Sequence, residues 1–233
     1  MTRRPMWAAV TVGFVCLLGT LVPALAQQGD KGDEVERVKN ATIVFTEIMG
    51  AEDKAIPKAI LDKAEGIAIF PDTLKVGFGF GGHRGRGVLL ARNTDGTWSS
   101  PAFMTLTGGS VGAQIGGQAI DIVLVIMNRR GVENLVRNRF KLGVDASVAA
   151  GPVGRDAEAS TDLAMRAEIL SYSRTRGLFV GVSLKGTVVK ADTDANRDFY
   201  GAPLTSRQIV FEHKGGAPPP VGELKAVVGR YAK

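Results

Sequence analysis

Residues 66–92 read GIAIFPDTLKVGFGFGGHRGRGVLLAR. Short runs of aliphatic and aromatic residues alternate here with Pro, Asp and Gly, which is typical of strands joined by tight turns. Similar runs recur downstream. The sequence therefore predicts strands at 67–70, 75–80, 87–92, 102–106 and 120–127. Short strands and short connections, such as Asn-Thr-Asp-Gly at 93–96, favour antiparallel pairing.

Other segments show the spacing of helices. Apolar residues at three- and four-residue steps predict a helix over 33–49, and Pro57 near the start of a second run favours a short helix to about residue 64. The same reasoning predicts helices around 131–140 and 206–213, whereas strict alternation predicts strands over 142–148 and 178–184. The run 120–127 is apolar on both faces, so it fits either a strand or a buried helix.

Together these elements predict one α+β domain, an antiparallel β-sheet or barrel-like sandwich packed by N- and C-terminal helices. A composition of 45% hydrophobic and 22% charged residues excludes intrinsic disorder as the main state. We expect this domain to span residues 27–215. A Gly-Gly-Ala-Pro-Pro-Pro linker and a short amphipathic tail follow over 216–233.

The first 26 residues have the features of a secretory signal peptide. Two arginines precede an acid-free apolar run, and Ala-Leu-Ala at 24–26 is a cleavage signal. A retained membrane anchor is the alternative, although the run is short for a span. Removal of the two arginines leaves 27 Lys and Arg against 23 Asp and Glu, which lowers the net charge from +6 to +4. The one cysteine, Cys16, lies inside the apolar run, so the mature chain has no disulfide or thiol nucleophile.

Several catalytic and cofactor motifs are matched only in part. The glycines at 77–82 satisfy the dinucleotide-binding pattern, but another strand follows where a helix is required. Residues 108–112 match the G-x-S-x-G elbow around Ser110, yet the glycines after it disfavour the helix that a serine hydrolase needs. His83 and His213 lack neighbouring ligands and are expected at surface or turn positions. The sequence thus predicts no catalytic residue, metal or other cofactor.

Basic residues are the remaining candidates for binding. Arg84 and Arg86 are expected on a Gly-rich loop, Arg174 and Arg176 precede Gly177, and Lys185 follows in the same region. Such charges commonly form a solvated face, but arginines beside phenylalanines also hold phosphate groups through bidentate hydrogen bonds. We therefore predict that these five cations bind anionic lipid.

Segments between about Ile56 and Gly201 resemble the SYLF domain family. The matching segments are AEGIAIFP at 64–71, the Gly-rich run 77–82, GVL at 87–89, WSSPAF at 98–103, GGSVGAQIG at 108–116, LGVDASVAAGP at 142–152, SYSR at 171–174, GLFVGVSLKG at 177–186 and NRDFYG at 196–201. The resemblance implies membrane-lipid binding without enzymatic activity, including phosphoinositide binding in eukaryotic members and actin association in some. It also accounts for the segment around Ser110 without catalysis.

The resulting functional prediction is an exported lipid-binding module in the periplasm or at the cell surface. It would attach to anionic or phosphoinositide-type lipids through its basic loops, with no nucleic-acid partner, and an exported bacterial protein would not meet actin. A structural envelope protein acting through protein partners is the alternative, followed by a serine hydrolase using Ser110. Replacing all five cations by Gln is expected to abolish vesicle binding and leave the melting temperature nearly unchanged.

Overall fold

A computed structural model describes residues 31–51, 55–78, 80–111, 116–137, 139–153, 166–175, 178–179, 182–216 and 218–233. The expected signal peptide at 1–26 lies outside the described residues. Among the helices that are described, none has both the length and the apolarity that a membrane span requires.

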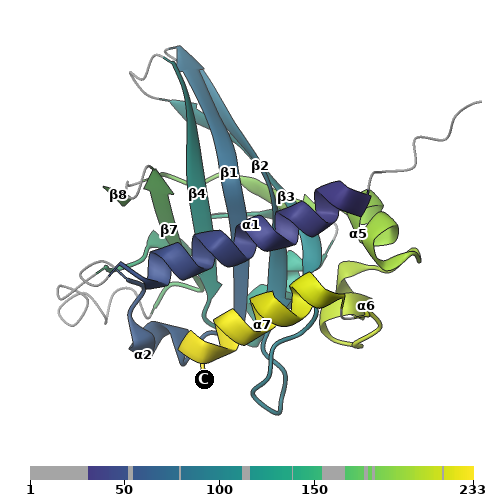
Figure 1. The fold of residues 1–233 in the computed structure, drawn as a ribbon. Helices are drawn as coiled ribbons and strands as arrows, with labels where there is room; N and C mark the ends of the chain where they lie inside the picture. The colour runs from purple at the N-terminus through teal and green to yellow at the C-terminus, as the bar shows by residue number, and fades with distance from the viewer. Residues whose placement is uncertain are drawn as a thin grey trace, which may run out of the picture.

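The centre of the molecule is a curled, nine-stranded sheet within the described residues (Figure 1). Its strands are β1 (Gly66–Phe78), β2 (Phe80–Ala91), β3 (Ala102–Val111), β4 (Gly116–Ile126), β5 (Phe140–Lys141), β6 (Val148–Ala150), β7 (Ile169–Thr175), β8 (Leu178–Phe179) and β9 (Val188–Ala191). The order is β5-β9-β3-β2-β1-β4-β7-β6, and β8 pairs with β7. All the pairs are antiparallel except β6 with β7.

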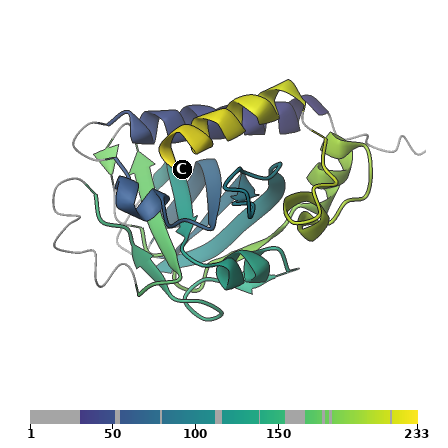
Figure 2. The ribbon, with the colours of Figure 1, turned by 90° about the horizontal axis from the view of Figure 1, so that it is seen from below.

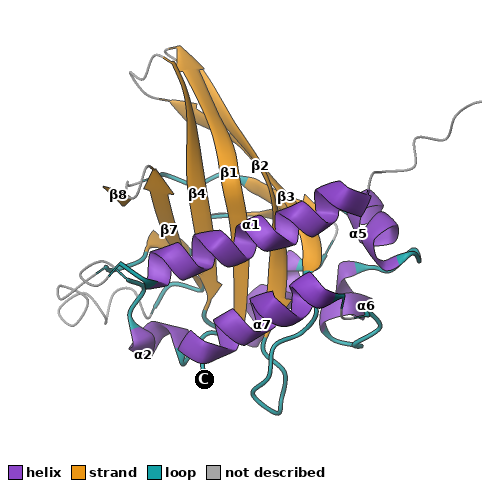
Figure 3. Cartoon of the chain, viewed as in Figure 1, coloured by secondary structure: helices purple, strands orange, loops and turns teal. Residues whose placement is uncertain are grey.

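Helices pack against this sheet from both sides (Figures 2 and 3). They are α1 (Lys31–Met49), α2 (Lys58–Leu61), α3 (Arg129–Leu135), α5 (Thr193–Tyr200), α6 (Ser206–Val210) and α7 (Pro219–Tyr231). Figure 2 shows α1 and α7 on the same side of the sheet, in purple and yellow. The predicted α+β class, with helices from both ends of the chain on a mainly antiparallel sheet, is confirmed.

Strand alternation divides the core into two layers. On β2, Val88 and Leu90 face α1 and α7, whereas Leu89 belongs to the layer on the opposite face. The run 120–126 shows the same division, since Val123 and Val125 face the two helices and Ile122 and Leu124 face away from them. A strand buried on both faces is apolar at nearly every position. This resolves the ambiguity at 120–127 in favour of strand β4.

The segment 66–92 forms a long hairpin. The predicted strand 67–70 and residues 75–78 of the next predicted strand are parts of one strand, β1, with an irregularity between Ile69 and Leu74 where Asp72 has a φ of 44°. The prediction that 75–80 is one uninterrupted strand was wrong, because β1 ends at Phe78 and β2 begins at Phe80. Figure 1 shows β1, β2 and β4 extending beyond α1 at this end of the sheet.

Two of the later strand predictions hold only in part. Residues 143–147 bend before β6 begins at Val148, because Gly143 has a φ of 74° and the backbone of Leu142 bridges to Ala146. Within 178–184, the described strand is limited to β8. The sequence analysis did not predict β7, β9 or α5. A helix is present in each predicted helical region, although α2, α3 and α6 are shorter than expected. The predicted helix over 131–140 was wrong at its end, because α3 ends at Leu135 and Phe140 belongs to strand β5.

The segment 216–233 contains helix α7, which packs on α1. Val221, Leu224 and Val228 are buried in the core layer beneath the helix pair. At the helix end, the carbonyl oxygen of Ala232 accepts a hydrogen bond from Trp98 Nε1 at 3.2 Å. Both contacts attach the C-terminal segment to the sheet.

Candidate functional site

Arg84 and Arg86 lie on strand β2, not on the expected loop. Both are exposed, and they point to the same face as α1 because alternate residues of a strand share a face. Gly85 between them and Gly87 after them face the other way. A side chain at Gly85 would collide with Thr73 Oγ1, and one at Gly87 would collide with the carbonyl oxygen of Ile69. The Arg-Gly-Arg-Gly run at 84–87 therefore combines close strand packing on one face with exposed cations on the other.

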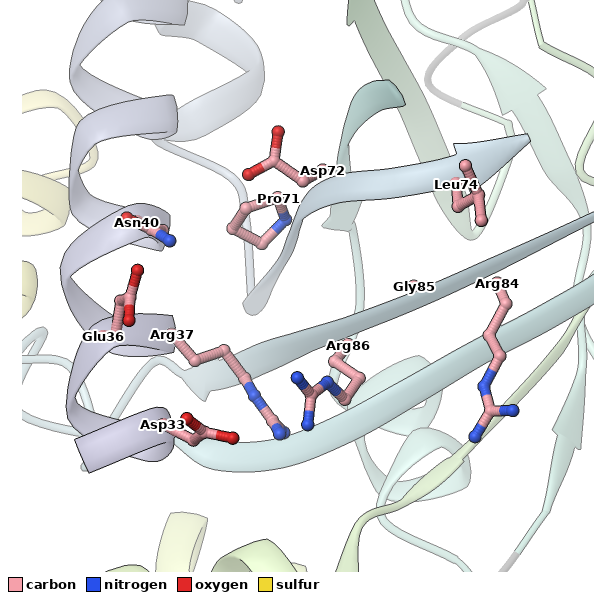
Figure 4. A pocket seen from close by; sticks show the side chains of 10 residues that line it. All are labelled: Asp33, Glu36, Arg37, Asn40, Pro71, Asp72, Leu74, Arg84, Gly85 and Arg86. Carbon is pink, nitrogen blue, oxygen red and sulfur yellow. The ribbon is translucent and has the colours of Figure 1, made fainter. Parts of the chain in front are cut away.

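Beside these arginines is a groove of about 570 Å³ between α1 and the β1–β2 hairpin. Its walls come from three elements (Figure 4). They are Asp33, Glu36, Arg37 and Asn40 of α1, Pro71, Asp72 and Leu74 of β1, and Arg84, Gly85 and Arg86 of β2. The groove is thus lined mainly by charged and polar side chains.

The arginines that line the groove differ in whether they form ion pairs with described residues. Arg37 is buried, lies 2.9 Å from Asp192 Oδ2, and is 3.6 Å from Glu34 Oε1, so its charge is already compensated. Neither Arg84 nor Arg86 makes a side-chain hydrogen bond or ion pair with any described residue. Their guanidinium groups are available to an anion from outside the chain.

Apolar side chains are exposed next to the two arginines. Leu74 pairs directly with Arg84 across the hairpin and is 52% exposed, and Val76, two residues further along β1, is 48% exposed. On the same face, Arg86 is in register with Thr105 of β3, which pairs with the exposed Lys190 of β9. Cations and apolar groups therefore lie side by side on this part of the sheet.

The other predicted cations lie elsewhere. Arg174 of β7 is 8% exposed and forms ion pairs with Glu47 of α1 and Asp121 of β4. Lys185 is exposed in the turn before β9, next to Gly143. Arg176 lies outside the described residues. Of the five predicted cations, the described structure brings Arg84 and Arg86 together in one groove.

His83, expected at the surface, is buried on the opposite face of β2. Its Nε2 atom lies 2.9 Å from Thr187 Oγ1, and its Nδ1 atom is buried with no hydrogen-bond partner among the described residues. Gly108 of β3 leaves room for this contact, since a side chain there would meet both His83 and Thr187. The first glycine of the G-x-S-x-G match therefore has a packing role. His213, at φ 53° in an exposed turn, is where the sequence predicted it.

The burial of His83 predicts a pH-dependent stability. Burial and, secondarily, the Lys75 cation lower the pKa of His83 from its usual 6.5, so the unfolded chain binds this proton more readily than the folded one. The contribution of His83 is complete above about pH 6.5 and is lost as the pH falls below it, by up to about 1.4 kcal/mol per pH unit. Urea unfolding at pH 7.5 and pH 5 should show a larger loss for wild type than for His83→Gln. Equal losses would contradict the prediction.

Two motifs related to catalysis can be located in the described chain only in part. Ser110 lies on β3, and its side chain and Gly112, which completes the G-x-S-x-G match, lie outside the described residues. Within the described ranges, no three His, Cys, Asp or Glu side chains are grouped to hold a metal ion.

Comparison with known proteins identifies the family. A model of the Ysc84 family, described as Las17-binding protein actin regulator, matches residues 107–231. The chain belongs to the Ysc84, or SYLF, family. The predicted resemblance is therefore confirmed, and the matched region includes helix α7.

Relatives of the Ysc84 family from yeasts and human resemble the chain over most of its length. The chain is 41% identical over 165 residues to an SH3 domain-containing protein of Schizosaccharomyces pombe, which covers 70% of the chain and 38% of the relative. It is 38% identical to Protein YSC84 of Saccharomyces cerevisiae, over 75% of the chain and 37% of the relative. For human SH3 domain-containing YSC84-like protein 1, the identity is 36% over 76% of the chain and 51% of the relative.

The chain spans about a third to a half of the length of these Ysc84 relatives. Another Saccharomyces cerevisiae relative, 38% identical, is named LAS seventeen-binding protein 3. These names refer to actin regulation, partner binding and SH3 domains, and none of them is the name of an enzyme.

Some residues of the groove and of the sheet beside it were missed by the sequence analysis. The groove residues are Asp33, Glu36 and Leu74. Val76 and Lys190 are exposed on the sheet outside the groove lining. Asp33 and Glu36 have the i, i+3 spacing of one helix face, and this spacing could have been detected in the sequence. Their position opposite Arg84 and Arg86 depends on how α1 crosses the sheet, which no local pattern encodes.

Proposed function

We propose that this Ysc84-family protein is a non-enzymatic module that binds phospholipid headgroups at the surface of anionic membranes. The observation that carries the proposal is the pair Arg84 and Arg86, exposed and unpaired among the described residues, beside the exposed Leu74 and Val76. Arginine binds phosphate oxygens through two parallel hydrogen bonds, and an adjacent apolar side chain can enter the interfacial region. The absence of enzymatic activity is part of the proposal.

Vesicle cosedimentation tests this function. A cation near an anionic leaflet contributes about 1 kcal/mol, so Arg84→Gln with Arg86→Gln should lower the affinity for phosphatidylglycerol vesicles roughly tenfold to thirtyfold. Wild-type binding should also weaken with added salt. Because neither arginine has a partner among the described residues, the melting temperature should change little.

The matched control removes the same charge elsewhere. Lys63 and Arg230 are exposed near α2 and the end of α7, at the other end of the helix layer from the groove, and Lys63→Gln with Arg230→Gln should bind like wild type. Equal losses in the two double variants would show that net charge alone controls binding. Unchanged binding in the groove variant would overturn the proposed site and favour a protein partner.

The location of the protein is a separate part of the proposal. We propose export from the signal-like features of residues 1–26, and export would keep the chain away from cytosolic actin. N-terminal sequencing of the mature protein should begin at Gln27. A mature protein that retains Cys16 would instead favour the membrane-anchor alternative.

A further inference from the structure

The groove beside Arg84 and Arg86 has an acidic wall facing its basic wall. Asp33 and Glu36 lie on one face of α1, both exposed, and Arg84 and Arg86 lie on β2 across the groove (Figure 4). Asp72, at the irregular part of β1, adds a third carboxylate to the lining. The groove between these groups has a volume of about 570 Å³, which is within the usual range for small-molecule sites.

These charges do not neutralise one another directly. No ion pair joins Asp33 or Glu36 to Arg84 or Arg86, although ion pairs form elsewhere on α1 and β7. An anion held by the arginines alone would leave the carboxylates uncompensated and would be repelled by them. A cation held by the carboxylates alone would leave the arginines uncompensated and would be repelled by them. A ligand that carries both charges is therefore the best electrostatic complement.

From this arrangement we infer that the groove selects a zwitterionic headgroup carrying a phosphate and a primary ammonium group. The phosphate would bind Arg84 and Arg86, and the ammonium group would donate hydrogen bonds to Asp33 and Glu36. Phosphoethanolamine has this chemistry, whereas the quaternary ammonium of phosphocholine has no N–H to donate. The inference rests on the proposed function and adds a headgroup preference to it.

Vesicles that differ only in the amine provide the test. Equimolar phosphatidylglycerol and phosphatidylethanolamine vesicles should bind the protein about three to ten times more tightly than vesicles in which phosphatidylcholine replaces phosphatidylethanolamine, because charge-assisted hydrogen bonds are replaced by a bulky cation without donors. Equal affinity for the two mixtures would overturn the headgroup preference for lipids in a membrane.

Substitution of the acidic wall should have two opposite effects. Asp33→Asn with Glu36→Gln should remove the preference for phosphatidylethanolamine over phosphatidylcholine. It should also strengthen binding to pure phosphatidylglycerol vesicles, because two repelling charges are lost. The control Glu133→Gln with Glu223→Gln makes the same charge change at exposed positions on α3 and α7 and should keep the preference. A preference that persists in the Asp33, Glu36 variant would overturn the assignment.

The outcomes separate this inference from the function on which it rests. Binding to phosphatidylglycerol vesicles that depends on Arg84 and Arg86, with no effect of the amine, would retain the proposed function and reject the headgroup preference. Failure to bind any vesicle would reject the proposed function.

The source of the headgroup is tested by a soluble arm. An NMR titration with glycerophosphoethanolamine, with glycerophosphocholine as the control, measures binding without a bilayer. If glycerophosphoethanolamine binds the wild type and does not bind the variant Asp33→Asn with Glu36→Gln, the groove is a site for the free headgroup, even if no vesicle binds. Selective vesicle binding without soluble binding would assign it to the lipid in a membrane. Failure of both arms would overturn the inference.

Discussion

Leu224→Ala should lower the free energy of unfolding by about 3 kcal/mol, because it removes a fully buried side chain and leaves a cavity between helix and sheet. Leu224 is on α7, with Val221 and Val228 buried on the same face of the helix. Chemical denaturation monitored by circular dichroism measures the change.

The neighbouring position supplies the control for this variant. Glu223 is exposed on the same helix, so Glu223→Ala should change the unfolding free energy by about 0.5 kcal/mol or less. A single unfolding transition for both variants would show that α7 unfolds together with the sheet. If Leu224→Ala matched wild type, α7 would not belong to the cooperative unit, and residues 216–233 would behave as a separate tail.

The parts of the fold that sequence predicts well are those whose side chains follow one simple period. Helix α1 has apolar residues at helical steps, and β2 and β3 have the composition of strands, so each was found from local pattern. The elements that were missed lack this pattern. In β7, Ser171, Ser173 and Arg174 interrupt the apolar residues, and both Ser173 and Arg174 are buried.

Helix α5 shows how a polar segment can still be structural. Asn196 is fully buried, and its Oδ1 atom accepts a hydrogen bond from the backbone N–H of Phe103 at 2.9 Å. This bond offsets the cost of burying the polar side chain. Asp192 caps the helix by accepting a hydrogen bond from the N–H of Ala195. The capping residue was a local signal that could have been used. The bond to Phe103 links positions far apart in the chain and could not have been predicted from it.

The candidate site also has residues that could be identified from the sequence and residues that could not. Arg84 and Arg86 were identified from residue type, and they share one face of β2 because they are two residues apart on a strand. The acidic wall could not be predicted, because its effect depends on α1 passing over that strand. Arg174 had the residue type of a lipid-binding cation, but tertiary contacts place it in a buried ion-pair cluster.

The ion-pair cluster around Arg174 is also connected to the groove through Asp121. Asp121 Oδ2 lies 3.2 Å from Arg174, and Asp121 Oδ1 accepts a hydrogen bond from the backbone N–H of Asp72 at 3.1 Å. Asp72 lines the groove, so these two contacts connect Arg174 to the edge of the groove. Removing Arg174 leaves Asp121, whose side chain is 18% exposed, without its cation. A carboxylate left in such a position destabilises the fold.

Arg174→Met should therefore lower the free energy of unfolding by about 2 to 3 kcal/mol, somewhat below the cost of breaking a fully buried pair because Glu47 is half exposed. The expected loss corrects the sequence-based prediction that all five cations can be replaced by Gln with little effect on the melting temperature. In a double-mutant cycle, Asp121→Asn should add little to the loss once Arg174 is replaced, because both changes remove the same interaction. At a temperature where Arg174→Met is fully folded, its affinity for phosphatidylglycerol vesicles should remain close to that of wild type. A variant of wild-type stability with lost vesicle binding would instead make Arg174 a lipid-binding cation, as the sequence alone predicted.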